Sequence, residues 1–192
     1  MVDAFNIILT AMFVNNVVLI MFLGMCPFFG VSGRLKPALG MGAAVLLVMT
    51  LASAITWLIY WFVLVTFSAE FLEIILFIFV IASLVQILEI LMKKYYPAMH
   101  DLLGIYLPLI TTNCAILGVA FLTIMEEYTF ASSVLYGFCA GIGFMIALLL
   151  MAGIRERLDL GDVPRAFKGV PIAFITAAMI SLAFMGIGTF LG

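Results

Sequence analysis

The stretch GMCPFFGV, residues 24–31, lies where the first hydrophobic run of the chain should leave a membrane. It carries Cys26, which is followed directly by a proline and has a glycine on either side. A second stretch, TNCAILGV at residues 112–119, carries Cys114 in the same spacing of cysteine, three residues, glycine and valine. The two cysteines therefore share a local setting in a chain that has few polar residues.

The composition is that of a membrane protein. Hydrophobic residues make up 67% of the 192 residues and charged residues only 9%, far from the mix found in soluble domains. Several apolar runs reach the roughly 20 residues that an α-helix needs to cross a bilayer. We therefore expect an all-α integral membrane protein, with residues 1–192 forming a single transmembrane domain surrounded by lipid. No basic cluster indicates a nucleic-acid partner.

Hydropathy predicts six spans, and the charges predict their orientation. Every Lys and Arg falls in the first, third or fifth loop, whereas the second and fourth loops and both termini hold only acidic charges. Because basic loops stay on the cytoplasmic side, we expect both termini to lie outside. The predicted spans are residues 5–25, 39–59, 72–92, 102–122, 131–153 and 171–191. The basic residues are Arg34, Lys36, Lys93, Lys94, Arg155, Arg157, Arg165 and Lys168.

The second half of the chain echoes the first. Besides the two cysteine stretches, ALGMGAAVLL at 38–47 aligns with LYGFCAGIGF at 135–144 through its small residues. Repeat 1 covers about residues 5–92 and repeat 2 about residues 102–191. Each repeat holds three spans, an odd number, so the two repeats enter the membrane in opposite directions. Inverted repeats of this kind are related by a pseudo-two-fold axis in the membrane plane.

Such an axis constrains the depth of the two cysteines. It places equivalent residues at equal and opposite depths, so Cys26 and Cys114 can meet a common ligand only near the midplane. A straight first helix, rising about 1.5 Å per residue, would instead carry Cys26 to the cytoplasmic interface. We therefore expect the first helix to be broken at Pro27, where the backbone lacks a donor, with Gly24 and Gly30 permitting the bend.

The fourth span has matching signs of interruption. Pro108 precedes a polar run at residues 111–113, which ends at Cys114. Interrupted hydrophobic segments at corresponding positions of two repeats indicate a site at the membrane midplane. By contrast, the small residues of the fifth span, among them Gly137 and Gly141, are typical of close helix packing. Cys139 lies among them and is expected only to pack.

Two thiols near the midplane are compatible with a disulfide, with half of a metal site, or with coincidence. A [2Fe–2S] cluster normally takes four cysteine thiolates. The chain has Cys26 and Cys114 in equivalent positions and one further cysteine without a repeat partner. A cluster here would therefore need a second subunit that supplies two more thiolates.

A few polar residues in the spans are weaker candidates, either for an ion path or for supporting the cysteines. Glu89 has Gln86 one turn before it in the third span, and an intramembrane carboxylate is a functional hypothesis, unless Glu89 reaches the interface. Asn15 and Asn16 in the first span, and Asn113 beside the second cysteine, either line such a path or bond to neighbouring helices. No nucleophile–base pair, phosphate-binding loop or dinucleotide fingerprint is present, so no catalytic residue is assigned.

Three stretches carry a family resemblance. VNNVVLIMFLGMCPFFGVS at 14–32, LGIYLPLITTNCAILGVA at 103–120 and GIRERLDLGDVPRAFKGVPIAFITA at 153–177 closely resemble the A subunits of Rnf electron-transport complexes. They are less closely similar to the E subunits of Na⁺-translocating NADH:quinone reductases, which remain the alternative. A small inverted-repeat ion transporter is a further alternative, but it has no need for paired cysteines.

The resemblance implies a subunit of a redox-driven translocase that is not catalytic alone. Such a subunit lies in a bacterial inner membrane or an archaeal plasma membrane and pairs with a homologous E subunit. The resemblance further implies that Cys26 and Cys114 supply half the ligands of a shared intramembrane [2Fe–2S] cluster. The complex would pass electrons between ferredoxin and NAD while moving Na⁺ or H⁺. Flavins and other iron–sulfur clusters would belong to its other subunits, B, C, D and G.

Overall fold

A computed structural model describes the chain except residues 1–3, 15, 68–69, 96–105, 165–166 and 192. The described residues form helices, turns and bends without a strand, which confirms the predicted all-α class. The elements are α1 (Ala4–Leu9), the π-helical turn η1 (Thr10–Val14), α2 (Met25–Val31), α3 (Leu35–Ile59), the π-helical turn η2 (Tyr60–Leu64), α4 (Val65–Phe67), the 3₁₀ turn η3 (Glu70–Leu72), α5 (Glu73–Tyr95), α7 (Leu107–Thr111), α8 (Cys114–Met125), α9 (Phe130–Asp159) and α10 (Val170–Leu191).

Four helical stretches are long and apolar enough to cross a bilayer. They are Leu35–Leu64, Glu73–Tyr95, Pro108–Met125 and Phe130–Asp159, and a shorter apolar helix covers Val170–Gly186. These stretches fall on the predicted second to sixth spans, with ends that differ by a few residues. The predicted first span is not a single long helix. Six spans and an inverted repeat therefore remain predictions.

Two of the predicted spans are interrupted. In the first, η1 ends at Val14, the described residues 16–24 are non-helical, and α2 then begins at Met25. In the other, α7 ends at Thr111 and α8 begins at Cys114, after a turn at Thr112 and an extended residue at Asn113. Each cysteine thus lies in the first turn of a helix that restarts after a break.

The break in the first span lies earlier than the proline predicted. Pro27 is inside α2, in its first turn, where a backbone N–H would have no intrahelical partner, so the missing donor costs nothing. Gly24 caps the helix in the left-handed conformation, with φ 76° and ψ 27°. Cys26 and Pro27 are therefore helical, and of the two glycines expected to permit the bend it is Gly24 that lies at the break.

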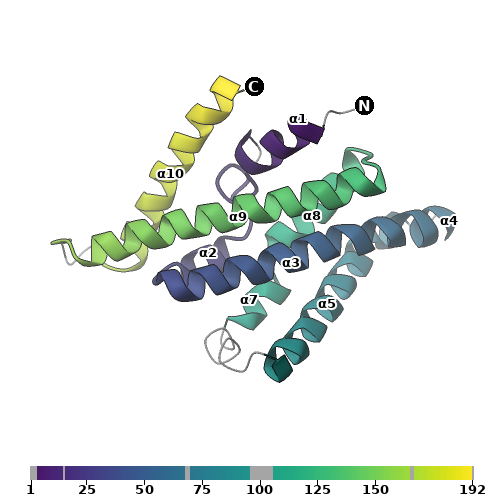
Figure 1. Ribbon diagram of the computed structural model, residues 1–192, viewed down its shortest axis with the longest axis horizontal. Helices are drawn as coiled ribbons and strands as arrows, with labels where there is room; N and C mark the ends of the chain where they lie inside the picture. The colour runs from purple at the N-terminus through teal and green to yellow at the C-terminus, as the bar shows by residue number, and fades with distance from the viewer. Residues whose placement is uncertain (1–3, 15, 68–69, 96–105, 165–166, 192) are drawn as a thin grey trace.

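The centre of the molecule is the antiparallel pair of α3 and α9, which run side by side (Figure 1). Small residues allow their close approach, as predicted for the fifth span. A Cβ at Gly141 would lie 2.9 Å from the Cα of Leu46, and one at Gly137 would collide with the hydroxyl of Ser53. The hydroxyl of Ser133 donates to the backbone oxygen of Ser53 across the interface, at 3.4 Å. Close backbone packing and interhelical hydrogen bonds are what hold helices together in lipid.

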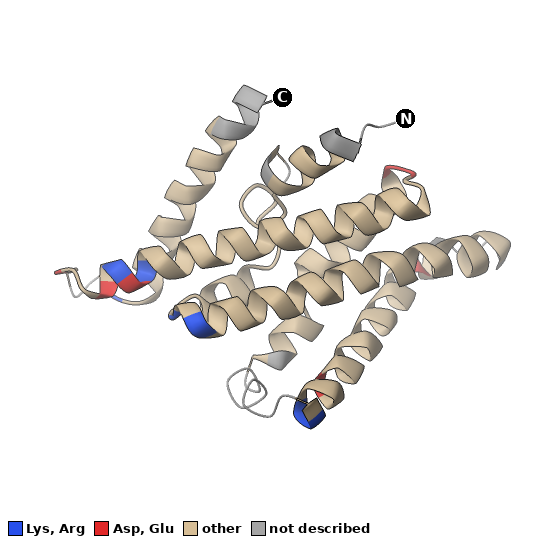
Figure 2. Cartoon of the chain, in the orientation of Figure 1, with Lys and Arg blue, Asp and Glu red and all other residues tan. Residues whose placement is uncertain are grey.

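Charges collect at the ends of the helices (Figure 2). The described Lys and Arg residues lie at the start of α3, at the ends of α5 and α9 and, in the case of Lys168, just before α10, whereas Glu126 and Glu127 form the turn at the opposite end of α9. One boundary differs from the prediction, because α9 continues to Asp159. Arg155 and Arg157 are therefore on a helix and not in a loop.

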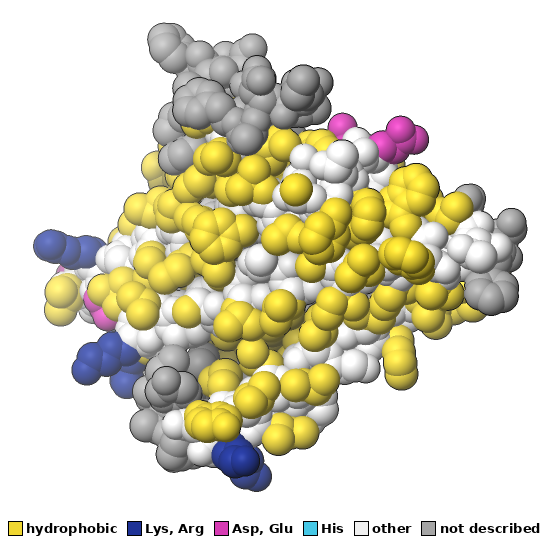
Figure 3. Space-filling view, turned by 45° about the vertical axis from the view of Figure 1, so that its right-hand side comes forward, with side chains coloured by type: hydrophobic (Ala, Val, Ile, Leu, Met, Phe, Trp, Pro, Cys, Tyr) yellow, Lys and Arg dark blue, Asp and Glu magenta, His cyan; other side chains and the backbone are white. Residues whose placement is uncertain are grey.

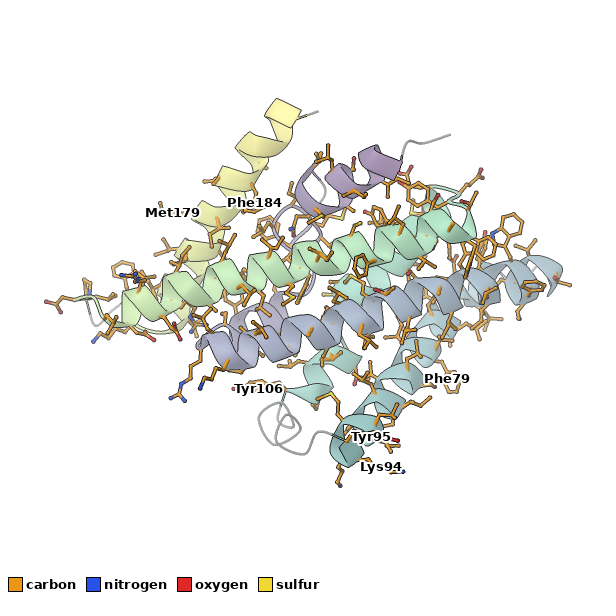
Figure 4. The ribbon with its side chains drawn as sticks, in the orientation of Figure 1. Phe79, Lys94, Tyr95, Tyr106, Met179 and Phe184 are labelled. Carbon is orange, nitrogen blue, oxygen red and sulfur yellow. The ribbon has the colours of Figure 1, made fainter. Side chains whose placement is uncertain are left out.

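On the face shown in Figure 3, the coloured side chains are mainly hydrophobic, and the charged ones lie near its edges. On α5, Phe79 points away from the other helices, as Met179 does on α10, and both side chains are 68% exposed (Figure 4). The ammonium of Lys94 lies 5.7 Å from the centre of the Tyr95 ring at the end of α5. Large exposed apolar side chains spread over the faces of long helices are typical of surfaces that contact lipid or another protein.

Candidate functional site

A hydrogen bond joins the two helix breaks. The backbone N–H of Gly24 donates to the sulfur of Cys114, with 2.9 Å between nitrogen and sulfur. Gly24 comes two residues before Cys26, so the contact brings the two cysteine stretches together from far apart in the sequence. The two cysteine stretches, which share their residue spacing in the sequence, therefore also lie next to each other in the structure.

The helices that follow the two breaks begin near each other and lead in opposite directions. α2 carries Cys26 in its first turn and ends just before the basic turn at Arg34. α8 begins with Cys114 and ends at the acidic turn of Glu126. In Figure 2 these two turns lie at opposite ends of the α3–α9 pair.

The non-helical segment 16–24 is held by its own Asn16 side chain and by a serine of α10. Asn16 is buried, its amide donates to the carbonyl oxygens of Met12 and Gly143, at 3.2 and 3.1 Å, and its oxygen accepts from two backbone N–H groups further along the segment. The hydroxyl of Ser181, on α10, donates to the backbone oxygen of Leu19. Irregular backbone at membrane depth is tolerated only where protein groups satisfy it in this way.

The break in the other span is capped by Asn113. Its side-chain oxygen accepts from the backbone N–H of Ala115 at 3.0 Å, as an N-cap residue does. The side chain is only 3% exposed, and its Nδ2 has no acceptor among the described residues. A buried donor without an acceptor is rare, and this one lies directly beside Cys114.

An open apolar pocket of about 450 Å³ adjoins this second break. Its walls come from α5, from the turn between α7 and α8, and from the first turns of α8. The sulfur-bearing side chain of Cys114 therefore faces a hollow at the surface. The pocket is lined by Ile78, Ile81, Ala82, Thr111, Thr112, Asn113, Cys114 and Leu117.

The exposure of the thiols bears on what they can bind. Cys26 and Cys114 are exposed on the surface of the chain, whereas Cys139 is buried between helices, as predicted. In the part of the chain that the structure describes, no three His, Cys, Asp or Glu residues gather into a group that could hold a metal ion. Two exposed thiols fit half of a four-thiolate cluster whose other ligands come from a second chain.

The remaining predicted candidates lie in different places. Asn16 is a structural anchor of the first break, while Asn15 lies outside the described residues. Glu89 accepts a hydrogen bond from Gln86 at 3.3 Å on an exposed face of α5. It is two turns beyond Ala82, the last α5 residue of the pocket. The structure thus brings Asn113 to the cysteines but leaves Glu89 apart from them.

Sequence reasoning missed three positioning residues. It treated Gly24 only as a hinge, although a glycine two residues before the repeated cysteine is a signal for a left-handed cap. It did not single out Ser181, since a serine in an apolar helix carries no distinguishing pattern. It assigned Arg155 only to a cytoplasmic loop. In the structure the Arg155 guanidinium donates to the backbone oxygen of Phe29 and to the hydroxyl of Ser32, both at 2.9 Å. Arg155 thereby ties the helix that carries Cys26 to α9.

A second hollow, of about 510 Å³, lies at the acidic end of the helices. The indole N–H of Trp57 donates to the backbone oxygen of Tyr128 at 2.8 Å beside it. Burial raises the pKa of the Tyr128 hydroxyl, and the Glu126 carboxylate raises this pKa further, so the hydroxyl stays neutral at physiological pH. Trp and Tyr at such a level are typical of the membrane–water interface. The lining residues are Trp57, Tyr60, Trp61, Val65, Glu73, Phe121, Thr123, Ile124, Met125, Glu127 and Tyr128.

The fold and site together define a helical membrane protein with two interrupted spans and a surface pair of cysteines at the interruptions. Residues 4–191 match the family described as "Rnf-Nqr subunit, membrane protein". The chain therefore belongs to the Rnf-Nqr family of membrane subunits, and the family resemblance of its motifs is confirmed.

Curated relatives cover nearly the whole chain. It is 58% identical over 173 residues to the A subunit of the ion-translocating oxidoreductase complex of Azoarcus sp. (strain BH72), covering 90% of each chain. It is 52% identical over 184 residues to the protein of the same name from Cereibacter sphaeroides, covering 96% of this chain and 95% of the relative. It is 51% identical over 180 residues to the A subunit of the Na⁺-translocating ferredoxin:NAD⁺ oxidoreductase complex of Acetobacterium woodii, covering 94% of each.

Proposed function

We propose that this chain is the A subunit of an Rnf-type ion-translocating ferredoxin:NAD⁺ oxidoreductase complex. In this role Cys26 and Cys114 supply half the ligands of a [2Fe–2S] cluster that is shared with a homologous E subunit. The names of the relatives support the complex, and the paired thiols support the cluster. When bound, the cluster would supply one-electron transfer within the bilayer, so the chain is one part of a redox-driven translocase and not an enzyme by itself.

The observation that carries the proposal is the meeting of the two cysteine stretches. Gly24, two residues before Cys26, contacts the Cys114 sulfur, and both thiols are exposed. Thiols that share a cluster with a partner must lie at the protein surface, and they must come from elements that contact each other. A transporter of the same architecture would need neither property.

The proposed architecture is six spans in two inverted repeats, about residues 5–92 and 102–191. α2 begins beside the start of α8, and the two helices run toward opposite ends of the α3–α9 pair, which supports this arrangement. The antiparallel pairing of α3 with α9, the central helix of each repeat, also supports it. Basic helix ends would face the cytoplasm and both termini would lie outside, in a bacterial inner membrane or an archaeal plasma membrane.

The other parts of the complex would come from partner subunits. The E subunit would supply two further thiolates, and subunits B, C, D and G would carry the flavins, the other iron–sulfur clusters and the NAD site. The transported ion would be Na⁺ or H⁺; the relative from Acetobacterium woodii is named for Na⁺. Within this chain, Asn113 would support Cys114, Asn16 would brace the first break, and Glu89 is the residue left for an ion path.

The test uses the intact complex with single cysteine variants. We expect Cys26→Ser and Cys114→Ser each to abolish the EPR signal of the intramembrane [2Fe–2S] cluster and the electron transfer from ferredoxin to NAD⁺. Cys139→Ser is the matched control and should retain both, because its side chain is buried between helices. A complex that keeps the signal and the activity in both variants would overturn the assignment of the ligands.

A second experiment tests the shared site. This chain, produced alone, should contain no [2Fe–2S] cluster by iron analysis and EPR, and co-production with the E subunit should restore it. A cluster bound by the chain alone would contradict the sharing of ligands. If neither preparation holds a cluster while ion movement persists, an inverted-repeat transporter is the better description.

A further inference from the structure

The sulfur of Cys114 has a backbone donor whose position is unusually constrained. Gly24 donates to it at 2.9 Å, and Gly24 has the left-handed φ of 76° that L-residues with a side chain rarely adopt. Its carbonyl oxygen accepts from Phe28 at 3.3 Å, in the first turn of α2. The direction of the Gly24 N–H is therefore set by the start of α2, of which Gly24 is the N-cap.

Packing holds Gly24 in place from three sides. A Cβ at this position would lie 3.0 Å from the Cβ of Ala115, from the side-chain oxygen of Asn113 and from the Phe144 ring. Two of these contacts come from the start of α8 and the third from α9. A side chain here would have to push the backbone away from α8, and hence away from the Cys114 sulfur.

The residue before Gly24 is also fixed. The backbone N–H of Leu23 donates to the carbonyl oxygen of Val17 at 3.0 Å. Its side chain packs on α8 over Gly118, where a Cβ would lie 2.6 Å from a Leu23 methyl carbon. A glycine on α8 thus makes room for the residue that precedes the donor. The geometry of the donor depends on these two glycines, one in each cysteine stretch.

Hydrogen bonds to the sulfurs are one of the main influences on the reduction potential of an iron–sulfur cluster. The reduced form carries one more negative charge, which is shared by its sulfur atoms. A donor N–H therefore stabilises the reduced form more than the oxidised form, and it does so more strongly in a low-dielectric site. Removal or displacement of the donor lowers the reduction potential.

We propose that Gly24 is a positioning residue that raises the reduction potential of the cluster by donating its backbone N–H to the Cys114 sulfur. This inference rests on the proposed function, since it concerns the cluster that Cys26 and Cys114 are proposed to share. It assigns Gly24 a task beyond the hinge that the sequence indicates. Gly118 leaves room for the side chain of Leu23, the residue directly before the donor.

The experiment is an EPR-monitored redox titration of the intact complex. Gly24→Ala should retain the [2Fe–2S] signal but shift its midpoint potential to a more negative value. Gly118→Ala, which displaces Leu23 without changing the residue at position 24, should shift the potential in the same direction by less. Gly153→Ala is the matched control, because a Cβ there meets nothing within 4 Å, and its potential should equal that of the wild type.

A spectroscopic measurement covers the case in which Gly24→Ala does not assemble. In wild-type complex labelled with ¹⁵N-glycine, pulsed EPR of the reduced cluster should detect coupling to a glycine nitrogen. Where Gly24→Ala assembles, that coupling should be lost, because position 24 then carries an unlabelled alanine nitrogen, and its loss identifies Gly24 as the source of the coupling. An absent coupling in the wild type overturns the proposal, as does an unchanged potential in Gly24→Ala. If the wild-type complex has no cluster that depends on Cys26 and Cys114, the proposed function itself fails.

Discussion

The side-chain amide of Asn16 donates to the carbonyl oxygen of Gly143 at 3.1 Å, and this bond fastens the non-helical part of the first span to the central helix α9. Gly143 has no side chain in the way, and a Cβ there would lie 3.2 Å from the Asn16 amide nitrogen. The irregular backbone that leads to Cys26 is therefore braced against the most deeply packed pair of helices.

Replacement of Asn16 should destabilise the protein without changing ion transport. Asn16→Ala leaves buried backbone donors and acceptors unsatisfied, at a cost of about 1–3 kcal/mol, and should lower the thermal midpoint of the purified complex. Gln86→Ala, on the exposed face of α5, should change the midpoint little. A structural role also predicts an unchanged number of ions moved per electron; a changed ratio would place Asn16 on the ion path instead.

A larger side chain at Gly137 should force α3 and α9 apart. Because the position already abuts the Ser53 hydroxyl, Gly137→Val overpacks the interface and should cost about 1–3 kcal/mol. Thermal denaturation followed by tryptophan fluorescence measures the effect. Gly153→Val, at an open position of the same helix, is the control. Equal midpoints for the two variants would mean that the small-residue interface does not determine stability.

Loss of Arg155 should loosen the helix that carries Cys26. Its guanidinium bonds the Phe29 oxygen and the buried Ser32 hydroxyl, and hydrogen bonds to charged groups contribute about 1.5–3 kcal/mol each. Arg155→Met should therefore lower the thermal midpoint and reduce the cluster content per complex, and Arg155→Lys should do so less. Arg157→Met, exposed on the same turn, should leave both unchanged. Cluster content that is equal in all three variants would refute a positioning role for Arg155.

The charge distribution predicts which ends of the helices are accessible from each side. A cysteine introduced by Glu126→Cys should react with a membrane-impermeant maleimide in intact cells. One introduced by Lys93→Cys should react only after the membrane is opened. The physical basis is the retention of basic segments on the cytoplasmic side. Protection of position 126 in intact cells, together with reaction at position 93, would reverse the proposed orientation.

Much of the architecture could be predicted because membrane insertion leaves strong signals in a sequence. Apolar length marks the long helices, and the breaks were predicted from proline, glycine and polar residues inside apolar runs. The position of the first break was wrong by a few residues. Pro27 suggested that the helix breaks at the proline itself, but a proline is well accommodated in the first turn of a new helix. The position of the bend depends on the residues that Gly24 packs against, and these are tertiary contacts that the local sequence does not specify.

The candidate site was predictable only as a pair of residues. The repeated spacing around Cys26 and Cys114 drew attention to both thiols, and the count of thiolates indicated a partner subunit. The bonds that hold their surroundings join distant positions, such as Ser181 with Leu19 and Arg155 with Phe29. Nothing in the local sequence of a serine or an arginine specifies such partners, because the partners are chosen by helix packing.

By itself, the sequence determined that this chain is an all-helical membrane protein of the Rnf-Nqr family with two cysteines in matching stretches. Composition and motif spacing are local properties, and they need no knowledge of which helices touch. The tertiary structure decided that the two stretches meet, that Gly24 donates to the Cys114 sulfur, and that both thiols remain exposed while Cys139 is buried. In the bilayer, backbone groups freed at a break must find partners within the protein. Asn16 supplies some of them locally, and helix packing brings in the others, the Cys114 sulfur and the Ser181 hydroxyl.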